Sequence, residues 1–450
     1  MDSLVNHQAD KKADKKADNK ANKKAANIQK KSYPKFLLVW AGQLMSGLGN
    51  GMTAFALGVY VYRQTQSAAN FAMVTLCLFI PSILLRPLGG VLADRFDRRF
   101  LIIGGDLGSA VAVLFLLMCT LSGDLSLWKI YLGVGINSIF TALQAPAYKA
   151  SVTDLLTADQ FAKAGGLVQL ASSAQHLFSP VAAGFILSLG SLTTVLLVDL
   201  STFLIAVAAV LTIRRRCGAP RQASGWSLTK DIGEGWRAVT SHRGVLRVVV
   251  LISLITFFVG FLQTLFAPML LSFSDARTLG LVQSISATGM LLSSLLLGIL
   301  GSKGKQSTIL LSSLAAAGLF IALMGITTNT VFITAVFFLF FCALPLINTS
   351  ADVLIRTRIP NEQQGRAWGI IGLLSQVGYI AAYSTSGLLA DRLFNPLLME
   401  NGPLADSVGR LIGTGLGRGI GLMFIIAGML MVLVTALSSN ILFRTEQEYV

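Results

Sequence analysis

The stretch "GGVLADRFDRR", residues 89–99, places five charged side chains in the six positions from Asp94 to Arg99. Apolar runs flank it on both sides, "FAMVTLCLFIPSILL" (71–85) before it and "FLIIGGDLGSAVAVLFLLMC" (100–119) after it. An apolar run of about 20 residues is long enough to cross the hydrocarbon layer of a membrane as a helix. The pattern therefore predicts a charged turn between two membrane-spanning helices.

Composition extends this prediction to the whole chain. Hydrophobic residues make up 54% of the sequence and charged residues 13%, whereas an average soluble domain has about 25% charged residues. Backbone groups in lipid must form their hydrogen bonds within one segment, which favours helices, and the alternating pattern of a membrane β-barrel is absent. Twelve apolar segments begin near Phe36, Ala69, Phe100, Leu127, Phe161, Thr193, Val245, Thr278, Thr308, Val331, Gly365 and Gly417.

The longest polar break, residues 214–244, separates these segments into two sets of six. The predicted fold is an all-α integral membrane protein with twelve transmembrane helices in two pseudo-symmetric six-helix bundles. The expected domains are a Lys-rich disordered tail (1–35), an N-terminal bundle (36–214), a central loop (215–244), a C-terminal bundle (245–443) and a C-terminal segment (444–450). Binding of the tail to anionic lipid is the alternative to a purely solvated segment.

The placement of Lys and Arg predicts the orientation of the chain in the membrane. If the N-terminus is cytoplasmic, 29 of the 36 Lys and Arg residues face the cytoplasm and six face the outside. We therefore expect a multi-pass protein of the bacterial inner membrane with both termini, the central loop and residues 89–99 on the cytoplasmic side.

The two halves also repeat each other weakly. "TADQFAKAGGL" (157–167) matches "PNEQQGRAWGI" (360–370) in five positions, and each follows the fourth helix of its set. A second echo of residues 89–99 occurs at "GILGSKGKQ" (298–306). Two such halves are typical of membrane transporters, whose substrate site lies where the halves meet.

The charged turn has the form G-x-L-A-D-R-x-x-R-R, and in this respect the chain resembles the major facilitator superfamily over residues 36–443. Asp97 stands where that family often has Gly. The resemblance implies that Asp94 approaches the start of the eleventh helix, where Asn361 is a plausible N-cap, and so holds the halves together on the cytoplasmic side. The alternative is that the cluster only fixes topology. The residues of this expected gating latch are Gly90, Asp94, Arg95, Arg98, Arg99, Asn361 and Arg366.

Three further stretches resemble parts of the family. "SPVAAG" (179–184) is a relaxed form of the G-P-x-x-G-G element of the family's antiporters, or else only a packing kink. The last loop and helix (402–429) resemble exporters of macrolides, siderophores and peptide products. "GLLADR" (387–392) mimics the charged turn but falls on the outside by the count of Lys and Arg, so we interpret it as a coincidence or a helix end.

The resemblance also places certain helices around a cavity, and their polar residues recur at helical spacing. Hydrogen bonding between helices is the alternative role for each residue. A neutral, partly aromatic lining suits a bulky amphipathic molecule better than a small anion. The expected cavity residues are Gln43, Asn50, Asn137, Gln144, Gln169, His176, Gln263, Gln376, Tyr379 and Tyr383.

The candidates for proton coupling are His176, Asp352 and Asp199. Histidine titrates near working pH. Asp106 and Asp199 fall on the third and sixth helices, which are peripheral in this family, so a structural role is expected for them. Asp352 and Arg356 lie one helical turn apart and are expected to pair.

These observations predict a secondary active exporter of an amphipathic small molecule, such as a macrolide, a siderophore or a nonribosomal-peptide-like product, with exchange for protons as the expected driving force. Its expected partners are that substrate, protons and the lipid bilayer, without nucleic acid, and we expect a monomer. No nucleotide-binding glycine loop, nucleophile–base pair or metal cluster is visible, so no cofactor, metal or enzymatic activity is expected. An importer, a lysolipid flippase, or a membrane receptor or assembly protein on the same scaffold are the alternatives.

Overall fold

The computed structural model describes residues 33–156, 160–212, 243–300, 305–356 and 361–447. Within these ranges the chain is helical and contains no strand. Twelve of the described helices have 20 residues or more. Six form the N-terminal bundle: α2 (Tyr33–Thr65), α3 (Ala68–Arg95), α4 (Arg98–Leu121), α5 (Leu127–Leu155), α6 (Phe161–Leu189) and α7 (Leu192–Leu211). Six form the C-terminal bundle: α9 (Arg243–Leu271), α10 (Ala276–Leu300), α11 (Gln306–Ile326), α12 (Thr330–Arg356), α13 (Asn361–Leu389) and α16 (Arg418–Gln447).

Among the described residues, ten of these helices are long and apolar enough to span a membrane. The other two, α5 and α13, carry polar residues along their length, including Asn137 and Gln144 on α5 and Gln376 on α13. The prediction of an all-helical integral membrane fold is therefore confirmed. Helices of reduced hydropathy are the ones expected to face a polar interior rather than lipid.

Local sequence explains how individual helices begin and bend. Ser67 caps α3 by accepting a hydrogen bond from the backbone N–H of Asn70, and Asp97 caps α4 by accepting one from Arg99. Both are residue types that supply a side-chain acceptor to the unpaired N–H groups of a first turn. Proline lies inside five of the long helices, where neighbouring helices can stabilise the backbone group that loses its partner.

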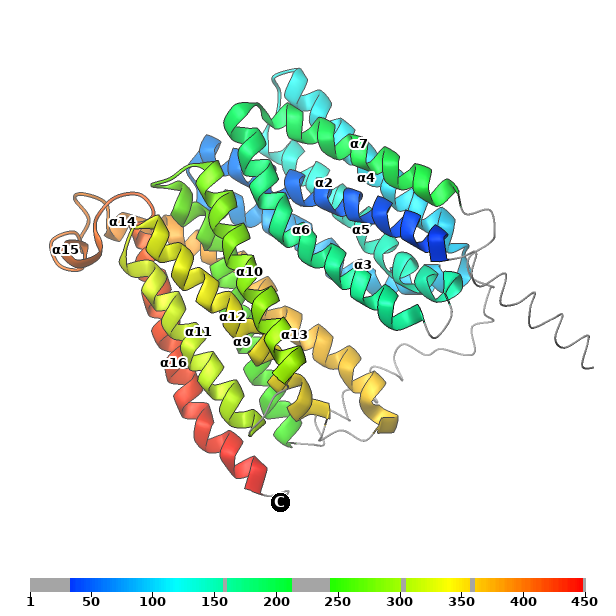
Figure 1. Ribbon diagram of the computed structural model, residues 1–450. Coiled ribbons are helices and arrows are strands. Elements are labelled where there is room, and N and C mark those ends of the chain that lie inside the picture. Colours follow the sequence, from blue (N-terminus) through cyan, green and yellow to red (C-terminus); the bar gives the residue numbers. More distant parts are fainter. Residues whose placement is uncertain (1–32, 157–159, 213–242, 301–304, 357–360, 448–450) are drawn as a thin grey trace, which may run out of the picture.

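The two bundles lie side by side (Figure 1). In the N-terminal bundle α2 packs on α7 and α5 on α3 and α4, and in the C-terminal bundle α11 packs on α16 and α9 on α13. Each bundle has its own apolar core. The cores are centred on residues such as Leu57 and Leu196 in the first and Leu265 and Phe424 in the second.

Contacts between the bundles are concentrated at one end, which we call the closed end. There α6 ends and α10 begins, and Figure 1 shows the bundles diverging toward the opposite end, where α13 begins, which we call the open end. A Cβ atom at Gly184 would lie 2.5 Å from the carbonyl oxygen of Ala276, and one at Gly280 would collide with the carbonyl oxygen of Pro180. Glycine is therefore needed for α6 and α10 to approach so closely.

Several expected features lie outside the described residues. These are nearly all of the Lys-rich tail, the central loop up to residue 242 and the last three residues of the chain. The described helices begin at Tyr33 and Arg243 for the two bundles, and α16 continues to Gln447.

Candidate transport cavity

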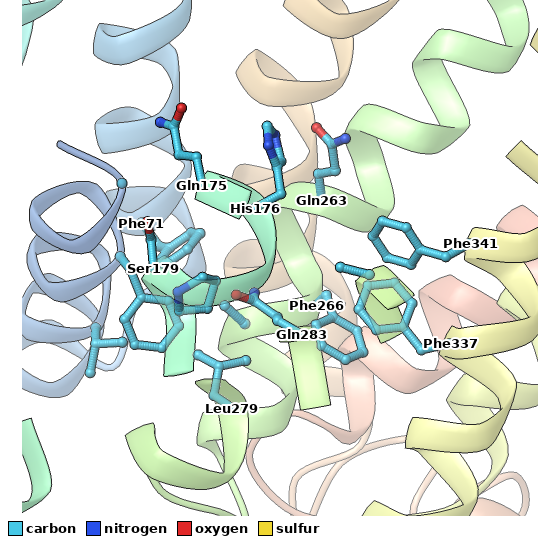
Figure 2. A pocket seen from close by; sticks show the side chains of 16 residues that line it. Phe71, Gln175, His176, Ser179, Gln263, Phe266, Leu279, Gln283, Phe337 and Phe341 are labelled. Atoms are coloured by element: carbon cyan, nitrogen blue, oxygen red, sulfur yellow. The ribbon is translucent and has the colours of Figure 1, made fainter. Parts of the chain in front are cut away.

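A cavity of about 400 Å³ lies between the bundles near the closed end (Figure 2). Helices α2, α3 and α6 line it from one bundle and α9, α10 and α12 from the other. Its wall is mainly apolar and includes five phenylalanines, with three glutamine side chains and one histidine among them. The residues whose side chains define this central cavity are Phe55, Phe71, Gln175, His176, Ser179, Gln263, Phe266, Leu279, Gln283, Phe337 and Phe341.

His176 presents one ring nitrogen to the cavity. Its Nδ1 lies 2.9 Å from the carbonyl oxygen of Ser172. Because a carbonyl oxygen only accepts hydrogen bonds, Nδ1 carries the proton, and in the neutral ring Nε2 remains an acceptor. Figure 2 shows His176 between Gln175 and Gln263, so these three residues place polar groups from both bundles on the same side of the cavity.

A second cavity, of about 360 Å³, lies within the N-terminal bundle and shares Gln175 with the central cavity. Its wall is rich in amides, hydroxyl groups and cations. We call it the polar wall. Its polar residues are Gln43, Ser46, Asn50, Arg86, Thr141, Gln144, Tyr148, Lys149, Ser172 and Gln175.

A third cavity, of about 290 Å³, lies within the C-terminal bundle and shares Gln263 with the central cavity. We call its surface the aliphatic wall, because branched aliphatic side chains are the largest class in its lining. Its polar residues are Thr256, Gln263, Asn348, Asp352, Ser375 and Tyr379. The aliphatic residues are Ile252, Ile255, Val259, Leu344, Ile347, Ile355 and Ile371.

Asp106 lies directly behind the polar wall. It is fully buried on α4, and its carboxylate accepts hydrogen bonds from Gln43 Nε2 (2.8 Å), Gln144 Nε2 (2.8 Å) and Ser46 Oγ (3.3 Å). Gln144 Nε2 also donates to Gln43 Oε1 at 3.0 Å, which closes a triangle of three polar side chains. Gly105 allows this approach, since a Cβ there would lie 2.6 Å from the Cβ of Gln144.

The geometry changes the expectation for Asp106. Its position on the third helix favoured a structural role, but all three of its donors line a cavity, so the carboxylate belongs to the same network as the cavity wall. No pattern in the sequence indicates this network, because its contacts join side chains of three different helices, α2, α4 and α5. Its hydrogen-bond partners in the described structure are all neutral.

Asp199 is also fully buried, on α7, but its surroundings differ. It accepts a hydrogen bond of 2.5 Å from Thr53 Oγ1, and Thr202 Oγ1 lies 3.5 Å from its other oxygen. None of these three residues lines a described cavity. Asp199 therefore fastens α7 to α2 away from the interior spaces.

The structure brings together some of the expected cavity residues and separates others. Gln43, Asn50 and Gln144 lie on the polar wall, His176 and Gln263 on the central cavity, and Tyr379 on the aliphatic wall. The remaining four line none of these three cavities. They are Asn137, Gln169, Gln376 and Tyr383.

Two of these four support the cavity residues from behind. Asn137 is buried and donates to the Oδ1 of Asn50 at 2.8 Å. Tyr383 is buried, donates to the Oε1 of Gln263 at 2.8 Å and packs edge-on against Phe79. Each therefore fixes the orientation of an amide that does line a cavity.

The phenylalanines of α12 were missed by the sequence analysis, although the run "FFLFFC" (337–342) was a visible signal.

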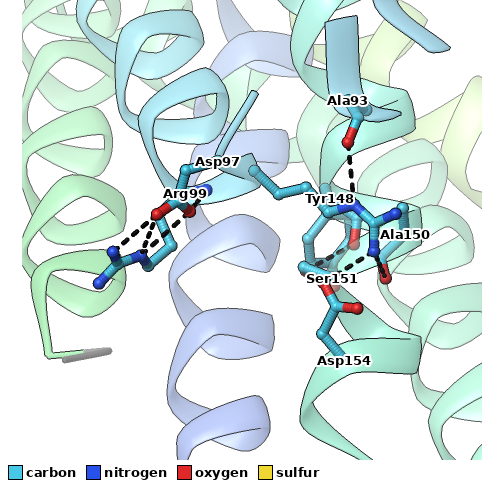
Figure 3. Close-up of polar contacts among 8 residues, drawn as sticks. Ala93, Asp97, Arg99, Tyr148, Ala150, Ser151 and Asp154 are labelled. Carbon is cyan, nitrogen blue, oxygen red and sulfur yellow. Dashed lines mark hydrogen bonds and ion pairs between the residues drawn. The ribbon is translucent and has the colours of Figure 1, made fainter. Parts of the chain in front are cut away.

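The arginines of the charged turn bond within the N-terminal bundle (Figure 3). Arg98 Nη1 pairs with Asp154 at 2.7 Å and donates to the carbonyl oxygen of Ala150 at 3.0 Å, and its Nε donates to that of Ala93 at 3.1 Å. Arg98 therefore ties the start of α4 to the ends of α3 and α5. Arg99 pairs with Asp97 at 2.7 Å. Asp97, a departure from the family pattern, therefore serves both as the N-cap of α4 and as the partner of Arg99.

The expected gating latch between the bundles is only partly visible. The side chains of Asp94, Asn361 and Arg366 lie outside the described part of the structure, as does that of Arg356. Arg95 is exposed at the end of α3. The latch on the cytoplasmic side therefore stays a prediction.

Comparison with known proteins agrees with this architecture. The family model of the Major Facilitator Superfamily matches residues 39–383. Macrolide efflux protein A of Streptococcus pyogenes is 26% identical over 367 residues, covering 80% of this chain and 90% of that protein. The enterobactin exporter EntS of Salmonella choleraesuis is 24% identical over 349 residues, covering 76% of this chain and 82% of that protein.

A solved structure shows the same fold. It is a bacterial homologue of the human lysosomal transporter Spinster in an inward-facing and unoccupied conformation. It superimposes with a TM-score of 0.71 at 14% identity, covering 92% of this chain and 97% of that one.

Proposed function

We propose that this chain, which belongs to the Major Facilitator Superfamily, exports an amphipathic small molecule across the bacterial inner membrane in exchange for protons. The relatives with which it shares about a quarter of its residues include an efflux protein for macrolides and an exporter of enterobactin. The two relatives' cargoes are chemically different, so the class of substrate has to be argued from the cavity of this chain.

The observation that carries the proposal is the contrast between the two walls. A molecule in the central cavity meets amides and hydroxyl groups toward Gln175 and aliphatic side chains toward Gln263. Burial of apolar surface contributes affinity in proportion to area, whereas buried polar groups must find partners. A substrate with one apolar face and one face of hydrogen-bonding groups satisfies both walls.

The direction of transport rests on the placement of charge. Because the Lys- and Arg-rich connections belong to the open end, the positive-inside rule places that end in the cytoplasm. The described conformation then receives its substrate from the cytoplasm, and closure of the open end with opening of the closed end releases it outside.

We assign the proton to Asp106. As a carboxylate it only accepts hydrogen bonds, and both amides of the triangle turn an N–H toward it. Once protonated, the carboxyl group of Asp106 carries an O–H that needs an acceptor. Gln43 or Gln144 must then turn its amide oxygen toward Asp106, or the hydrogen bond between that amide and Asp106 is lost. Such a turn breaks the Gln144–Gln43 hydrogen bond and changes the polar wall that the substrate meets. Proton binding and substrate binding are thereby linked through three side chains.

His176, Asp352 and Asp199 remain the other candidates for this role. His176 and Asp352 line cavities, and Asp199 does not. Comparison of His176→Gln, Asp352→Asn and Asp199→Asn with Asp106→Asn in one assay separates the four candidates.

The test uses inverted membrane vesicles, in which the cytoplasmic face points outward. With an acidic interior, vesicles that contain the protein should accumulate at least one of a macrolide, a catecholate siderophore and a lipopeptide, and a protonophore should abolish the accumulation. Vesicles without the protein are the control. Accumulation only in right-side-out vesicles would favour an importer, and movement of labelled lysolipid alone would favour a flippase.

A further inference from the structure

Asp391 joins the two bundles at the closed end. It lies in a π-helical turn, η2 (Ala390–Phe394), that continues α13 of the C-terminal bundle. Its carboxylate accepts three hydrogen bonds from the start of α3 in the N-terminal bundle: from Ser67 Oγ at 2.6 Å, Ala68 N at 3.0 Å and Ala69 N at 2.9 Å. Two of the three donors are backbone N–H groups.

The start of a helix is a favourable place for this carboxylate. The first N–H groups of α3 have no partner within the helix, and the helix dipole places partial positive charge there. Ser67 takes part in two bonds at once, because its oxygen accepts from Asn70 N at 3.1 Å while its proton goes to Asp391. Hydrogen bonds to an ionised acceptor are about twice as strong as those between neutral groups.

The backbone of α13 comes close enough for these bonds because of Gly387, one helical turn before Asp391. A Cβ atom at Gly387 would lie 2.6 Å from the Cα of Ala69 and 2.7 Å from the carbonyl oxygen of Ala68. Residues four apart share a helix face, so the glycine and the carboxylate of "GLLADR" both meet α3. The hexapeptide that the sequence analysis set aside as a coincidence or a helix end therefore makes a contact between the bundles.

Among the described residues, the buried charged groups do not cross this boundary. The partners of Asp106 and Asp199 lie in the N-terminal bundle, and Arg418 donates to the carbonyl oxygen of Gly325 in the C-terminal bundle. These networks persist when the bundles rotate as rigid bodies. The bonds of Asp391 are different, because they break whenever the closed end opens.

We propose that Asp391 is a positioning residue of the transport cycle, which holds the closed end shut by binding the start of α3 and must release it for that end to open. The same six-residue pattern, G-x-L-A-D-R, ends α3 at the open end (90–95) and α13 at the closed end (387–392). The proposal is independent of the substrate, of the coupling ion and of which end faces the cytoplasm.

The test measures the two ends directly in the full chain, with its four native cysteines replaced by serine. Spin labels at Ser122→Cys and Thr328→Cys report the closed end, and labels at Phe161→Cys and Lys305→Cys report the open end. All four positions lie at helix ends, and each pair spans the two bundles. In Asp391→Asn, which keeps the size of the side chain but removes its charge, we expect the population with a separated closed end to rise about tenfold. The distances at the open end should shorten correspondingly.

Asp406→Asn is the matched control. Asp406 lies at the same end, in the connection between η2 and α16, and its carboxylate lies 3.9 Å from Arg410 Nη2 of the same bundle. It should leave both distance distributions unchanged. Ser67→Ala, which removes one donor to Asp391, should shift the distances in the same direction by a smaller factor, and Asp391→Glu should restore part of the closed population.

Gly387→Val separates α3 from α13 by steric contact and shows that the labels detect opening. If Gly387→Val widens the closed end while Asp391→Asn and Ser67→Ala leave it unchanged, the proposal is wrong. An equal shift in Asp406→Asn would also overturn it, because loss of any carboxylate at the closed end would then suffice.

Discussion

The N-terminal and C-terminal bundles repeat one arrangement of six long helices but distribute polar groups in opposite ways. Among the described residues, the fully buried carboxylates, Asp106 and Asp199, both belong to the N-terminal bundle. The buried cation of the C-terminal bundle, Arg418, lies at the start of α16, where it satisfies the last carbonyl groups of α11. The polar wall belongs to the first bundle and the aliphatic wall to the second.

This difference indicates that the two halves of a pseudo-symmetric transporter can have different roles in substrate binding and coupling. Membrane insertion requires only hydropathy and helix length, which both halves share. Binding and coupling require specific side chains, and the interiors of the two halves supply different ones. We expect the N-terminal bundle to bind the proton and the polar part of the substrate, and the C-terminal bundle to bind its apolar part.

Asp106→Asn should have the largest effect on transport, and it tests whether the N-terminal bundle binds the proton. An amide cannot bind and release a proton at working pH, so uphill export in inverted vesicles should fall at least about a hundredfold, while exchange of substrate down its own gradient persists. His176→Gln and Asp352→Asn are run beside it. If Asp106→Asn exports normally and one of the other two variants loses uphill export, the residue replaced in that variant is the proton site instead.

Asp199→Ala should lower the stability of the N-terminal bundle without changing the coupling of transport to protons. Removing this carboxylate leaves the hydroxyl group of Thr53 buried without its acceptor, which costs about 1–3 kcal/mol. The expected result is a lower temperature of thermal unfolding in detergent, with an unchanged ratio of uphill to downhill transport in the protein that remains folded. A changed ratio would show that Asp199 takes part in coupling.

Val259→Thr tests whether the aliphatic wall binds the apolar part of the substrate. It replaces a methyl group of the aliphatic wall by a hydroxyl group of similar size, on a residue that is 6% exposed. We expect KM for an amphipathic substrate to rise about three- to tenfold with little change in Vmax, because apolar binding is lost while the cycle is intact. Equal KM values for the native chain and Val259→Thr would indicate that the substrate does not reach this wall.

Deletion of residues 2–30 should have the smallest effect. Lys31, Lys35 and the later connections retain the positive charge of the cytoplasmic side. Export by the correctly inserted protein should stay within about a factor of three of the full chain, because salt largely screens charges that are more than about 10 Å apart. Complete loss would indicate a specific partner of the tail.

The fold was predictable from the sequence because its determinants are local. Apolar runs of membrane length specify the helices, and the density of Lys and Arg specifies which connections lie together. The pattern around Asp94 carried the resemblance to the family. Half of the cavity could also be predicted, because polar residues at helical spacing on α2 and α5 share a face.

The rest depends on contacts between distant segments. Asp106 sits on a helix expected to be peripheral, and only the packing of α4 on α5 brings Gln144 to it. Residues 387–392 were interpreted as a coincidence or a helix end, and they do lie at the end of α13. Their contact with α3 was missed, because counting charges identifies the side of the membrane but not the neighbouring helix. The aromatic part of the central cavity was missed because Phe337 and Phe341 resemble any other apolar residues of a membrane helix.

The central claim is that substrate and protons exchange through the cavity, with Asp106 as the proton site. The most direct measurement follows the interior pH of acid-loaded inverted vesicles with a fluorescent dye while substrate is added outside. The account predicts that substrate collapses the pH gradient in vesicles with the native chain but not in those with Asp106→Asn or without the protein. Substrate that accumulates in native vesicles while the pH gradient stays constant, or an equal collapse with Asp106→Asn, would contradict it.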